Sequence, residues 1–216
     1  ATRGIRQGCK AAPGLWLIFT ALILEEVSSR TSNTWMKDCL TMFADDICMH
    51  QAVETPEQLH RLIRHIGVVL DILEEFLMDV NINKTSAILR LKGPAAAKLQ
   101  KQYVVRNKSG VFLKIPRANG TQTHIQLVSH VQYLGVTISY RGFERQTALA
   151  RIKASEKVGQ QLHRWLHAQN SLNKNQKCKL WQQCAYACMR YGLIPVGLTQ
   201  QSTQLIYSAA LRQLRR

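Results

Sequence analysis

Two adjacent aspartates, Asp45 and Asp46, are the residues of this chain best suited to do chemistry. They lie between two short apolar stretches, residues 40–43 and 47–49, which predicts a β-hairpin with both carboxylates at its tip. Neighbouring carboxylates repel each other, and a cation such as Mg²⁺ removes the conflict because it prefers oxygen ligands. A hairpin that presents an Asp-Asp pair to metal ions is the device of metal-dependent nucleotidyl transfer. The competing interpretation is a turn that uses Asp for its local hydrogen bonds.

A glycine-rich loop and an apolar run precede this pair. Residues 3–13 read Arg-Gly-Ile-Arg-Gln-Gly-Cys-Lys-Ala-Ala-Pro, and residues 15–24 are almost entirely apolar. The Pro-Gly pair at the start of this run predicts a mostly buried helix over residues 14–29. The apolar run is too short to span a bilayer, so we expect no membrane partner.

The loop and the Asp pair together resemble the reverse transcriptases of non-LTR (LINE-like) retrotransposons. That family carries Arg-Gly-x-x-Gln-Gly-x-x-x-Ser-Pro and, further along the chain, an aromatic-Ala-Asp-Asp box. The first motif is matched at Arg3, Gly4, Gln7, Gly8 and Pro13. Ala12 replaces the usual Ser, and Phe43 replaces the commoner Tyr of the box, and both changes are mild.

Two later segments extend the resemblance. Residues 80–85, Val-Asn-Ile-Asn-Lys-Thr, resemble the family's Asn-x-x-Lys-Thr segment, and residues 133–136, Tyr-Leu-Gly-Val, resemble its primer-grip region. The four motifs stand in the family's order and span residues 3–140. The rest of the chain resembles the family only as a basic helical thumb.

The resemblance implies an RNA-directed DNA polymerase that extends a DNA primer on an RNA template with deoxynucleoside triphosphates. It implies that Asp45 and Asp46 bind two Mg²⁺ ions, which activate the primer 3′-hydroxyl and steady the leaving pyrophosphate. Lys84 would protonate the pyrophosphate or stabilise its charge. The alternative for Lys84 is an ordinary surface lysine beside a turn.

The resemblance also assigns binding roles. The nucleotide and template pocket is assigned to Arg6, Gln7, Gly8 and Phe43. Glycine suits such a pocket because it lets the backbone approach a base or a phosphate closely. The primer grip is assigned to Tyr133, Leu134 and Gly135. The alternatives are an ordinary glycine loop for the first group and an apolar strand ending in a turn for the second.

Two-metal catalysis needs a third carboxylate, which in the family precedes the glycine-rich loop. We therefore expect this chain to be a fragment that lacks the fingers and the first palm strand. One ligand of the Mg²⁺ ions would come from that missing segment. The fragment alone is expected not to polymerise.

The composition indicates a nucleic-acid partner. A net charge of +16 with 46% hydrophobic residues describes a folded basic protein rather than a disordered basic tail. Residues 144–216 hold twelve Lys and Arg against two Glu, whereas residues 38–79 hold more acids than bases. Neutralising phosphates supplies affinity that does not depend on sequence. Contacts to the nucleic-acid backbone are assigned to Arg164, Lys174, Lys177 and Lys179.

The six cysteines contain no Cys-x-x-Cys pair, which favours free thiols in a reducing compartment. His163 and His167 are one helical turn apart, as are Cys184 and Cys188, so two facing helices could bind Zn²⁺. Solvated histidines and core thiols are the favoured interpretation. No targeting signal is visible, and the resemblance implies an intracellular, nuclear protein.

The element pattern predicts an α+β fold. We expect a polymerase palm, an antiparallel sheet with packed helices, over residues 1–143 and a mainly helical thumb over residues 144–216. A capped helix is predicted to begin after Thr55, since Pro follows it and Gln occupies the capping-box position. Strands are predicted around Lys84, as a hairpin within residues 103–115, and at residues 124–128 and 131–139.

Three alternatives stay open from sequence alone. A group II intron maturase-like or telomerase-like polymerase would share these motifs. A non-catalytic nucleic-acid-binding remnant of a retroelement would keep the charge without the chemistry. A ribosomal or chromatin-type basic protein would explain the charge but not the Asp pair. Oligomeric state has no signal in the sequence.

Overall fold

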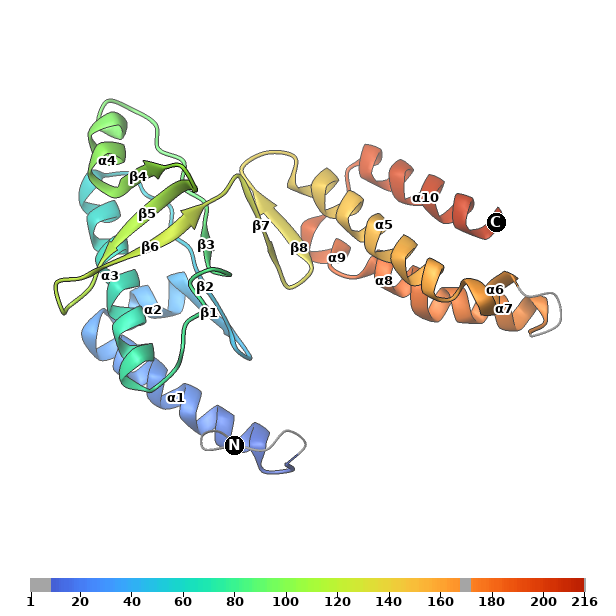
Figure 1. Ribbon diagram of the computed structural model, residues 1–216, viewed down its shortest axis with the longest axis horizontal. Helices are drawn as coiled ribbons and strands as arrows, with labels where there is room; N and C mark the ends of the chain where they lie inside the picture. The colour runs from blue at the N-terminus through green and yellow to red at the C-terminus, as the bar shows by residue number, and fades with distance from the viewer. Residues whose placement is uncertain (1–8, 168–171, 216) are drawn as a thin grey trace. The chain divides into compact units, whose positions relative to one another are not determined.

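The computed structural model describes residues 9–167 and 172–215, and the chain divides into two compact units, one ending at Leu127 and the other beginning at Val128 (Figure 1). The first unit contains, in chain order, α1 (Ala12–Arg30), α2 (Asn33–Cys39), β1 (Leu40–Phe43), β2 (Asp46–Met49), α3 (Pro56–Glu75), β3 (Ser86–Ala87), α4 (Ala96–Tyr103), β4 (Val104–Asn107), β5 (Gly110–Pro116) and β6 (Gln122–Leu127). This unit is a mixture of helices and strands, as predicted.

The second unit begins with a hairpin and continues as helices. Its elements are β7 (His130–Tyr133), β8 (Val136–Ser139), α5 (Phe143–Gln161), α6 (His163–His167), α7 (Lys174–Trp181), the π-helix η1 (Gln182–Tyr186), α8 (Ala187–Arg190), α9 (Leu193–Val196) and α10 (Gln200–Arg215). The described residues therefore confirm an α+β chain with a helical C-terminal region. The assignment of palm to residues 1–143 and thumb to residues 144–216 stays a prediction.

Helix α3 organises the first unit. It begins as predicted, because the Thr55 hydroxyl accepts a hydrogen bond from the Gln58 backbone N–H and the Gln58 side chain accepts one from the Thr55 N–H. Its apolar residues contribute to two cores. One core joins α3 to α1, α2 and the β1–β2 hairpin through Val69 and Ile72. The other joins α3 to the sheet through Leu59 and Ile63.

The sheet of the first unit is mixed rather than purely antiparallel. Its four strands lie in the order β3-β6-β5-β4, and β3 runs parallel to β6 while the other neighbours are antiparallel. The prediction of an antiparallel sheet was incomplete because the chain between β3 and β6 passes through α4 and a hairpin, the long connection that a parallel pair requires. The predicted strand around Lys84 is the two-residue β3, which begins at Ser86.

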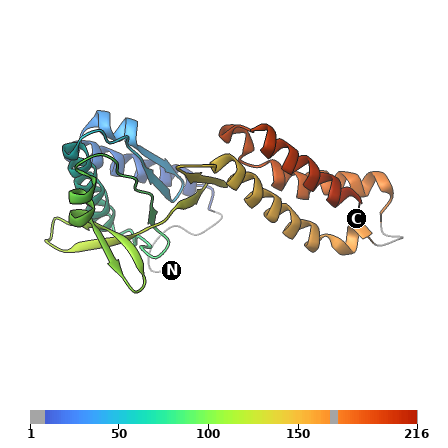
Figure 2. The same cartoon turned by 90° about the horizontal axis from the view of Figure 1, so that it is seen from above.

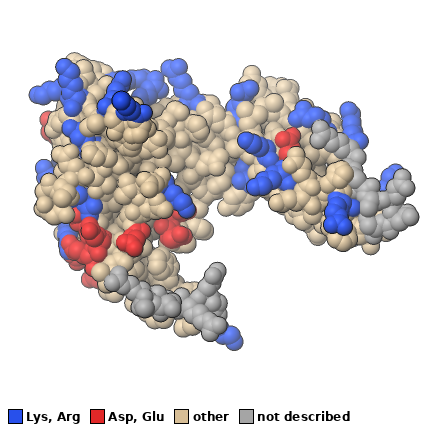
Figure 3. Space-filling model, viewed as in Figure 1, with Lys and Arg blue, Asp and Glu red and all other residues tan. Residues whose placement is uncertain are grey.

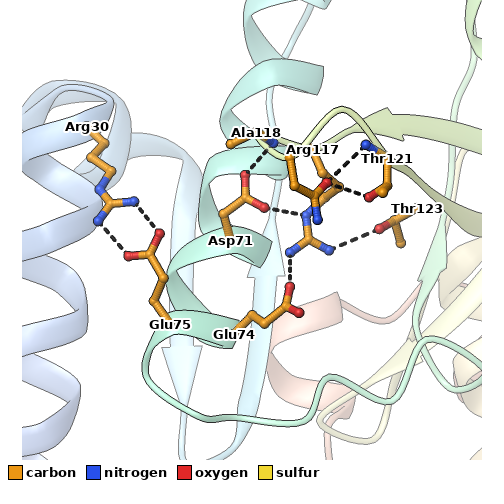
Figure 4. Close-up of polar contacts among 9 residues, drawn as sticks. Arg30, Asp71, Glu74, Glu75, Arg117, Ala118, Thr121 and Thr123 are labelled. Atoms are coloured by element: carbon orange, nitrogen blue, oxygen red, sulfur yellow. Dashed lines mark hydrogen bonds and ion pairs between the residues drawn. The ribbon is translucent and has the colours of Figure 1, made fainter.

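Ion pairs hold α3 to its neighbours (Figure 4). Arg117 follows β5, and its guanidinium donates to Asp71 and Glu74, each at 2.6 Å. The backbone N–H of Ala118 donates to the second oxygen of Asp71 at 3.0 Å. At the end of α3 a two-pronged contact joins α1 to the helix, because Arg30 donates to both oxygens of Glu75. These contacts fix α3 between α1 and the β5–β6 loop.

Helix α1 is less buried than predicted. Among its residues only Ile23 and Val27 are fully buried, and Leu17 and Ile18 are exposed. The prediction of a mostly buried helix was wrong for the described residues, because only one side of α1 contacts α2 and α3. By length and composition α1 is long and apolar enough to cross a membrane, so the prediction that this apolar run is too short for that was wrong. One such helix is weak evidence, because core helices and signal sequences pass the same test.

The second unit is built around α5. Figures 1 and 2 both show α5 and α10 running side by side, and Ile152, Met189 and Ala209 form the shared core. The buried hydroxyl of Thr147 in α5 accepts a hydrogen bond from the Thr137 N–H of β8 at 3.0 Å. This bond joins the β7–β8 hairpin to the helices.

The predicted strand 131–139 is two strands. Tyr133 pairs with Val136, and the two residues between them, Leu134 and Gly135, have φ of +48° and +81°. Two consecutive left-handed residues make the tight turn that suits the twist of a hairpin. The predicted continuous strand missed this turn because leucine rarely adopts a positive φ, although the alternative of an apolar strand ending in a turn allowed for one.

Candidate functional site

The β1–β2 hairpin carries the Asp pair, as the sequence predicted. Four cross-strand pairs run from Leu40–Met49 at the base to Phe43–Asp46 at the tip. The side chains of Leu40, Ile47 and Met49 pack against the core shared with α1, α2 and α3. The base of the hairpin is therefore anchored, and its tip projects from that anchor.

The tip itself is open to solvent. Asp45 and Asp46 are exposed, and the neighbouring Phe43 exposes 59% of its surface. Ala44 has φ +52°, a left-handed conformation that costs a residue with a side chain roughly 1–2 kcal/mol. Within the described residues, no side-chain hydrogen bond or ion pair engages Asp45 or Asp46. In the described structure the turn therefore does not use these carboxylates for local hydrogen bonds, and the metal role of Asp45 and Asp46 stays a prediction.

Exposed oxygens on adjacent residues fit Mg²⁺. That ion commonly uses one or two protein carboxylates and takes its remaining ligands from water and substrate phosphates. Among the described residues, no cluster of three or more His, Cys, Asp or Glu could hold a metal by itself.

Lys84 lies on a separate turn of the same unit. The turn is organised by Asn81, whose carbonyl accepts from the backbone N–H groups of Lys84 and Thr85, each at 3.0 Å, and from the Thr85 hydroxyl at 2.9 Å. The Lys84 side chain is exposed. In the described structure no hydrogen bond or ion pair joins it to Asp45 or Asp46, so its predicted catalytic role stays a prediction.

Charge is segregated within the first unit. On the face seen in Figure 3, Asp and Glu side chains gather in the lower half of the unit, and Lys and Arg predominate in its upper half. The acidic stretch of residues 38–79 contains α3 and the Asp pair. A basic protein with a local acidic region can attract cations there and phosphates elsewhere.

The predicted primer-grip residues form the tip of the β7–β8 hairpin in the second unit. A Cβ atom on Gly135 would lie 2.4 Å from the Tyr191 ring and 3.2 Å from the Arg151 guanidinium. The Arg151 guanidinium lies 5.1 Å from the centre of the Tyr191 ring. The turn is thus packed against the helices at Gly135. Sequence reasoning missed both Arg151 and Tyr191 because nothing local links them to this turn.

The remaining predicted nucleic-acid contacts lie on the helical unit. Arg164 is exposed on α6, and Lys174 and Lys179 are exposed on α7. Lys177 is half-buried on the same helix. Asn173 caps α7 by accepting a hydrogen bond from the Gln176 N–H at 2.9 Å, which fixes the direction of the helix. Arg6, Gln7 and Gly8 lie outside the described residues.

The zinc alternative gains no support from the described residues. The side chain of His167 is not among them, and His163 is exposed. Around Cys188 the structure places an arginine instead of another ligand, since Arg151 donates to the Cys188 carbonyl at 2.9 Å and contacts its sulfur at 3.4 Å. A cation beside a thiol disfavours a second cation at the same atom.

Comparison with known proteins found one family. The model of the family "Reverse transcriptase (RNA-dependent DNA polymerase)" matches residues 1–138. Comparisons with curated proteins and with solved structures returned no match. The matched residues include the Asp pair, the Lys84 turn and the tip of the β7–β8 hairpin, and they make up more than half of the chain. The chain belongs to the reverse transcriptase (RNA-dependent DNA polymerase) family.

Proposed function

We propose that this chain supplies the palm and thumb of an RNA-directed DNA polymerase that extends a DNA primer on an RNA template. The observation that carries the proposal is the β1–β2 tip. Two exposed carboxylates stand on a strained turn whose base is anchored in a core, inside the segment that matches the family. Strain of this kind concentrates at functional sites.

The roles of the residues follow from their chemistry. Asp45 and Asp46 would hold Mg²⁺, which when bound supplies charge neutralisation to the transferring phosphoryl group. The exposed ring of Phe43 adjoins the pair and offers an apolar face to the nucleotide or template. Lys84 would supply positive charge or a proton to the leaving pyrophosphate. Arg6, Gln7 and Gly8 keep their proposed place in the nucleotide pocket.

The second unit would hold the primer and template. The tip of Tyr133, Leu134 and Gly135 would support the primer end. The phosphate backbone would contact Arg164, Lys174, Lys177 and Lys179. The motif set further favours an origin in a non-LTR, LINE-like element, which would act in the nucleus. A group II intron maturase-like enzyme would use the same residues in the same roles.

A metal-binding experiment tests the proposal. Mn²⁺, a spectroscopic substitute for Mg²⁺, is titrated by electron paramagnetic resonance into the chain with a primer–template and a deoxynucleoside triphosphate. We expect D45N and D46N each to weaken Mn²⁺ binding at least about tenfold. The control is D79N, which removes another exposed carboxylate of the first unit and leaves the hairpin intact.

The same titration separates the polymerase from the non-catalytic alternative. Equal Mn²⁺ affinity in D45N, D46N and D79N would contradict the proposal. It would then favour a remnant that binds nucleic acid through charge alone. Residual weak Mn²⁺ binding to the nucleic acid is measured without protein and subtracted.

A further inference from the structure

A groove on the helical unit has no role in the function proposed above. Two adjoining hollows, of about 440 Å³ and 420 Å³, lie among α8, α9 and the first turns of α10. They share Tyr186, Arg190 and Ile194 and so form one depression. Each hollow is within the size range of small-ligand sites. We call this depression the Tyr–Arg groove; its further wall residues include Tyr191, Leu198 and Tyr207.

The backbone around the groove is irregular. Tyr186 ends the π-helix η1, a rare element that occurs frequently at functional sites. Helix α9 is bounded by Gly192 and Gly197, with φ of +73° and +75°. A Cβ atom on Gly192 would lie 3.2 Å from the Gly135 carbonyl oxygen, so this bend requires glycine. The sharp turns on either side of α9 shape the wall of the groove.

Aromatic rings and a guanidinium line the groove. Trp181 stacks on Tyr186 with ring centres 5.3 Å apart, and the Arg190 guanidinium lies 5.6 Å from the centre of the Tyr186 ring. Tyr207 exposes 66% of its surface and Tyr191 exposes 56%. Exposed aromatic rings beside an arginine provide the stacking surfaces and the phosphate contact that unpaired nucleotides use.

The charge of the surrounding chain selects an anionic occupant. Residues 157–216 contain nine Lys and Arg and no Asp or Glu. In the described structure no carboxylate pairs with Arg190. An occupant with flat apolar rings and one negative charge per unit would satisfy both the tyrosines and the arginine. An acidic peptide would satisfy the charge but would leave most of the ring surface uncovered.

We infer that the Tyr–Arg groove binds a single-stranded segment of nucleic acid, with an unpaired base stacked on Tyr207 and a phosphate held by Arg190. The inference rests on the proposed function in one respect, that the partner is a nucleic acid. A duplex could not occupy the groove in this way, because its bases are already stacked on one another. The groove would therefore hold a template or displaced strand outside the paired region.

Fluorescence anisotropy of the whole chain with labelled oligonucleotides of about twelve nucleotides, in RNA and DNA form, tests the inference. We expect Y207A to weaken binding of single strands about tenfold, while Y207F, which keeps the ring, binds as the unchanged chain does. The control L214A removes an exposed apolar side chain from the same helix outside the groove and should not change the affinity.

The salt dependence identifies the phosphate contact. R190A should lower the slope of log affinity against log salt concentration by about 0.7, the contribution of one phosphate on a single strand. R212A removes an exposed charge of α10 outside the groove and should leave the slope unchanged. An iodouracil-containing oligonucleotide should form a photocrosslink to the peptide that contains Tyr207.

Two results would overturn the inference. The first is equal single-strand affinity in Y207A, Y207F and the unchanged chain. The second is competition by a polyglutamate peptide that depends on Tyr207, which would make the occupant a protein.

A blunt RNA–DNA duplex separates this inference from the proposed function. If the duplex binds and Y207A does not affect single strands, the groove inference fails and the polymerase proposal stands.

Discussion

Two of the tight hairpins in the described chain, β1–β2 and β7–β8, begin their turns alike and differ in their surroundings. In each, a two-residue turn follows an aromatic residue, and the first turn residue has a positive φ, +52° at Ala44 and +48° at Leu134. The β1–β2 tip is exposed and carries the Asp pair. The β7–β8 tip is pressed against Tyr191, which leaves no room for a Cβ atom at Gly135.

The difference shows two ways to maintain a strained turn. A strained backbone persists only where the surrounding structure determines it. At the β7–β8 tip the helices do this directly, since Tyr191 and Arg151 enclose the turn. At the β1–β2 tip only the ladder of the hairpin and its anchored base hold Ala44 in place. We therefore expect substitutions at the packed tip to change stability strongly, and those at the open tip to change stability little and metal binding more.

The largest effect is expected from G135A. The added methyl would meet Tyr191 at 2.4 Å and would also strain a residue at φ +81°. Overpacking and left-handed strain together should cost about 3–4 kcal/mol of unfolding free energy. Hydrogen exchange of peptides covering residues 130–139 should accelerate. Unchanged exchange there would show that the packing of this tip is not as described.

The open hairpin can be weakened through its anchor. R117A would leave Asp71 without its main partner. The Arg117 side chain is only 11% exposed and that of Asp71 only 14%. We expect a loss of about 2–3 kcal/mol and faster hydrogen exchange in residues 40–49, because α3 supports the hairpin. The control is R30A, whose pair with Glu75 is 39% and 49% exposed and should contribute at most about 1 kcal/mol. Equal effects of R117A and R30A would contradict this distinction.

Local patterns predicted the features that depend on neighbouring residues. The capping box at Thr55 and the hairpin around Asp45 are coded within a few positions, and both are found. The turn at Leu134 escaped prediction because packing rather than residue type enforces it. The pairing of β3 with β6 and the contact of Arg117 with Asp71 join residues about forty or more positions apart, for which a single sequence carries no signal.

The candidate site likewise has features that the sequence predicted and features that only the tertiary fold creates. Motif spacing singled out the residues of both tips, but only the Asp pair was predicted to stand at the tip of a hairpin. It did not predict that one tip is open and the other is covered, since Tyr191 and Arg151 reach Gly135 through the tertiary fold. It also missed the Tyr–Arg groove, whose walls come from residues on α8, α9 and α10.

The A44G variant is expected to change the unfolding free energy less than G135A or R117A, and to raise it rather than lower it. Glycine removes the left-handed strain at φ +52° but adds entropy to the unfolded chain. The net change should stabilise the first unit by about 0.5 kcal/mol in denaturant unfolding. L134G should not stabilise the second unit, because it removes the half-buried side chain of Leu134 along with the strain. A destabilised A44G variant would show that the alanine makes contacts of its own.

The smallest change in stability is expected on acidification, and it should be confined to the open β1–β2 hairpin. His65 of α3 is nearly buried, its ring lies 4.5 Å from that of Trp35 in α2, and its Nδ1 has no hydrogen-bond partner among the described residues. Burial, helped by Arg61 and Arg64, lowers the pKa of His65 below its ordinary value of 6.5. The unfolded chain therefore binds the proton more readily than the folded one.

The stabilisation from neutral His65 should be complete above a pH of about 6.5 and lost as the pH falls toward the lowered folded pKa. Because α2 leads directly into β1, hydrogen exchange in residues 40–49 should accelerate on acidification more than exchange in residues 130–139. H65F keeps a neutral ring beside Trp35 and should flatten this pH dependence. H124Q, which replaces an exposed histidine of the same unit, should leave it unchanged. If H65F retains the full acid response, the titrating group lies elsewhere and the anchor of the open hairpin is insensitive to His65.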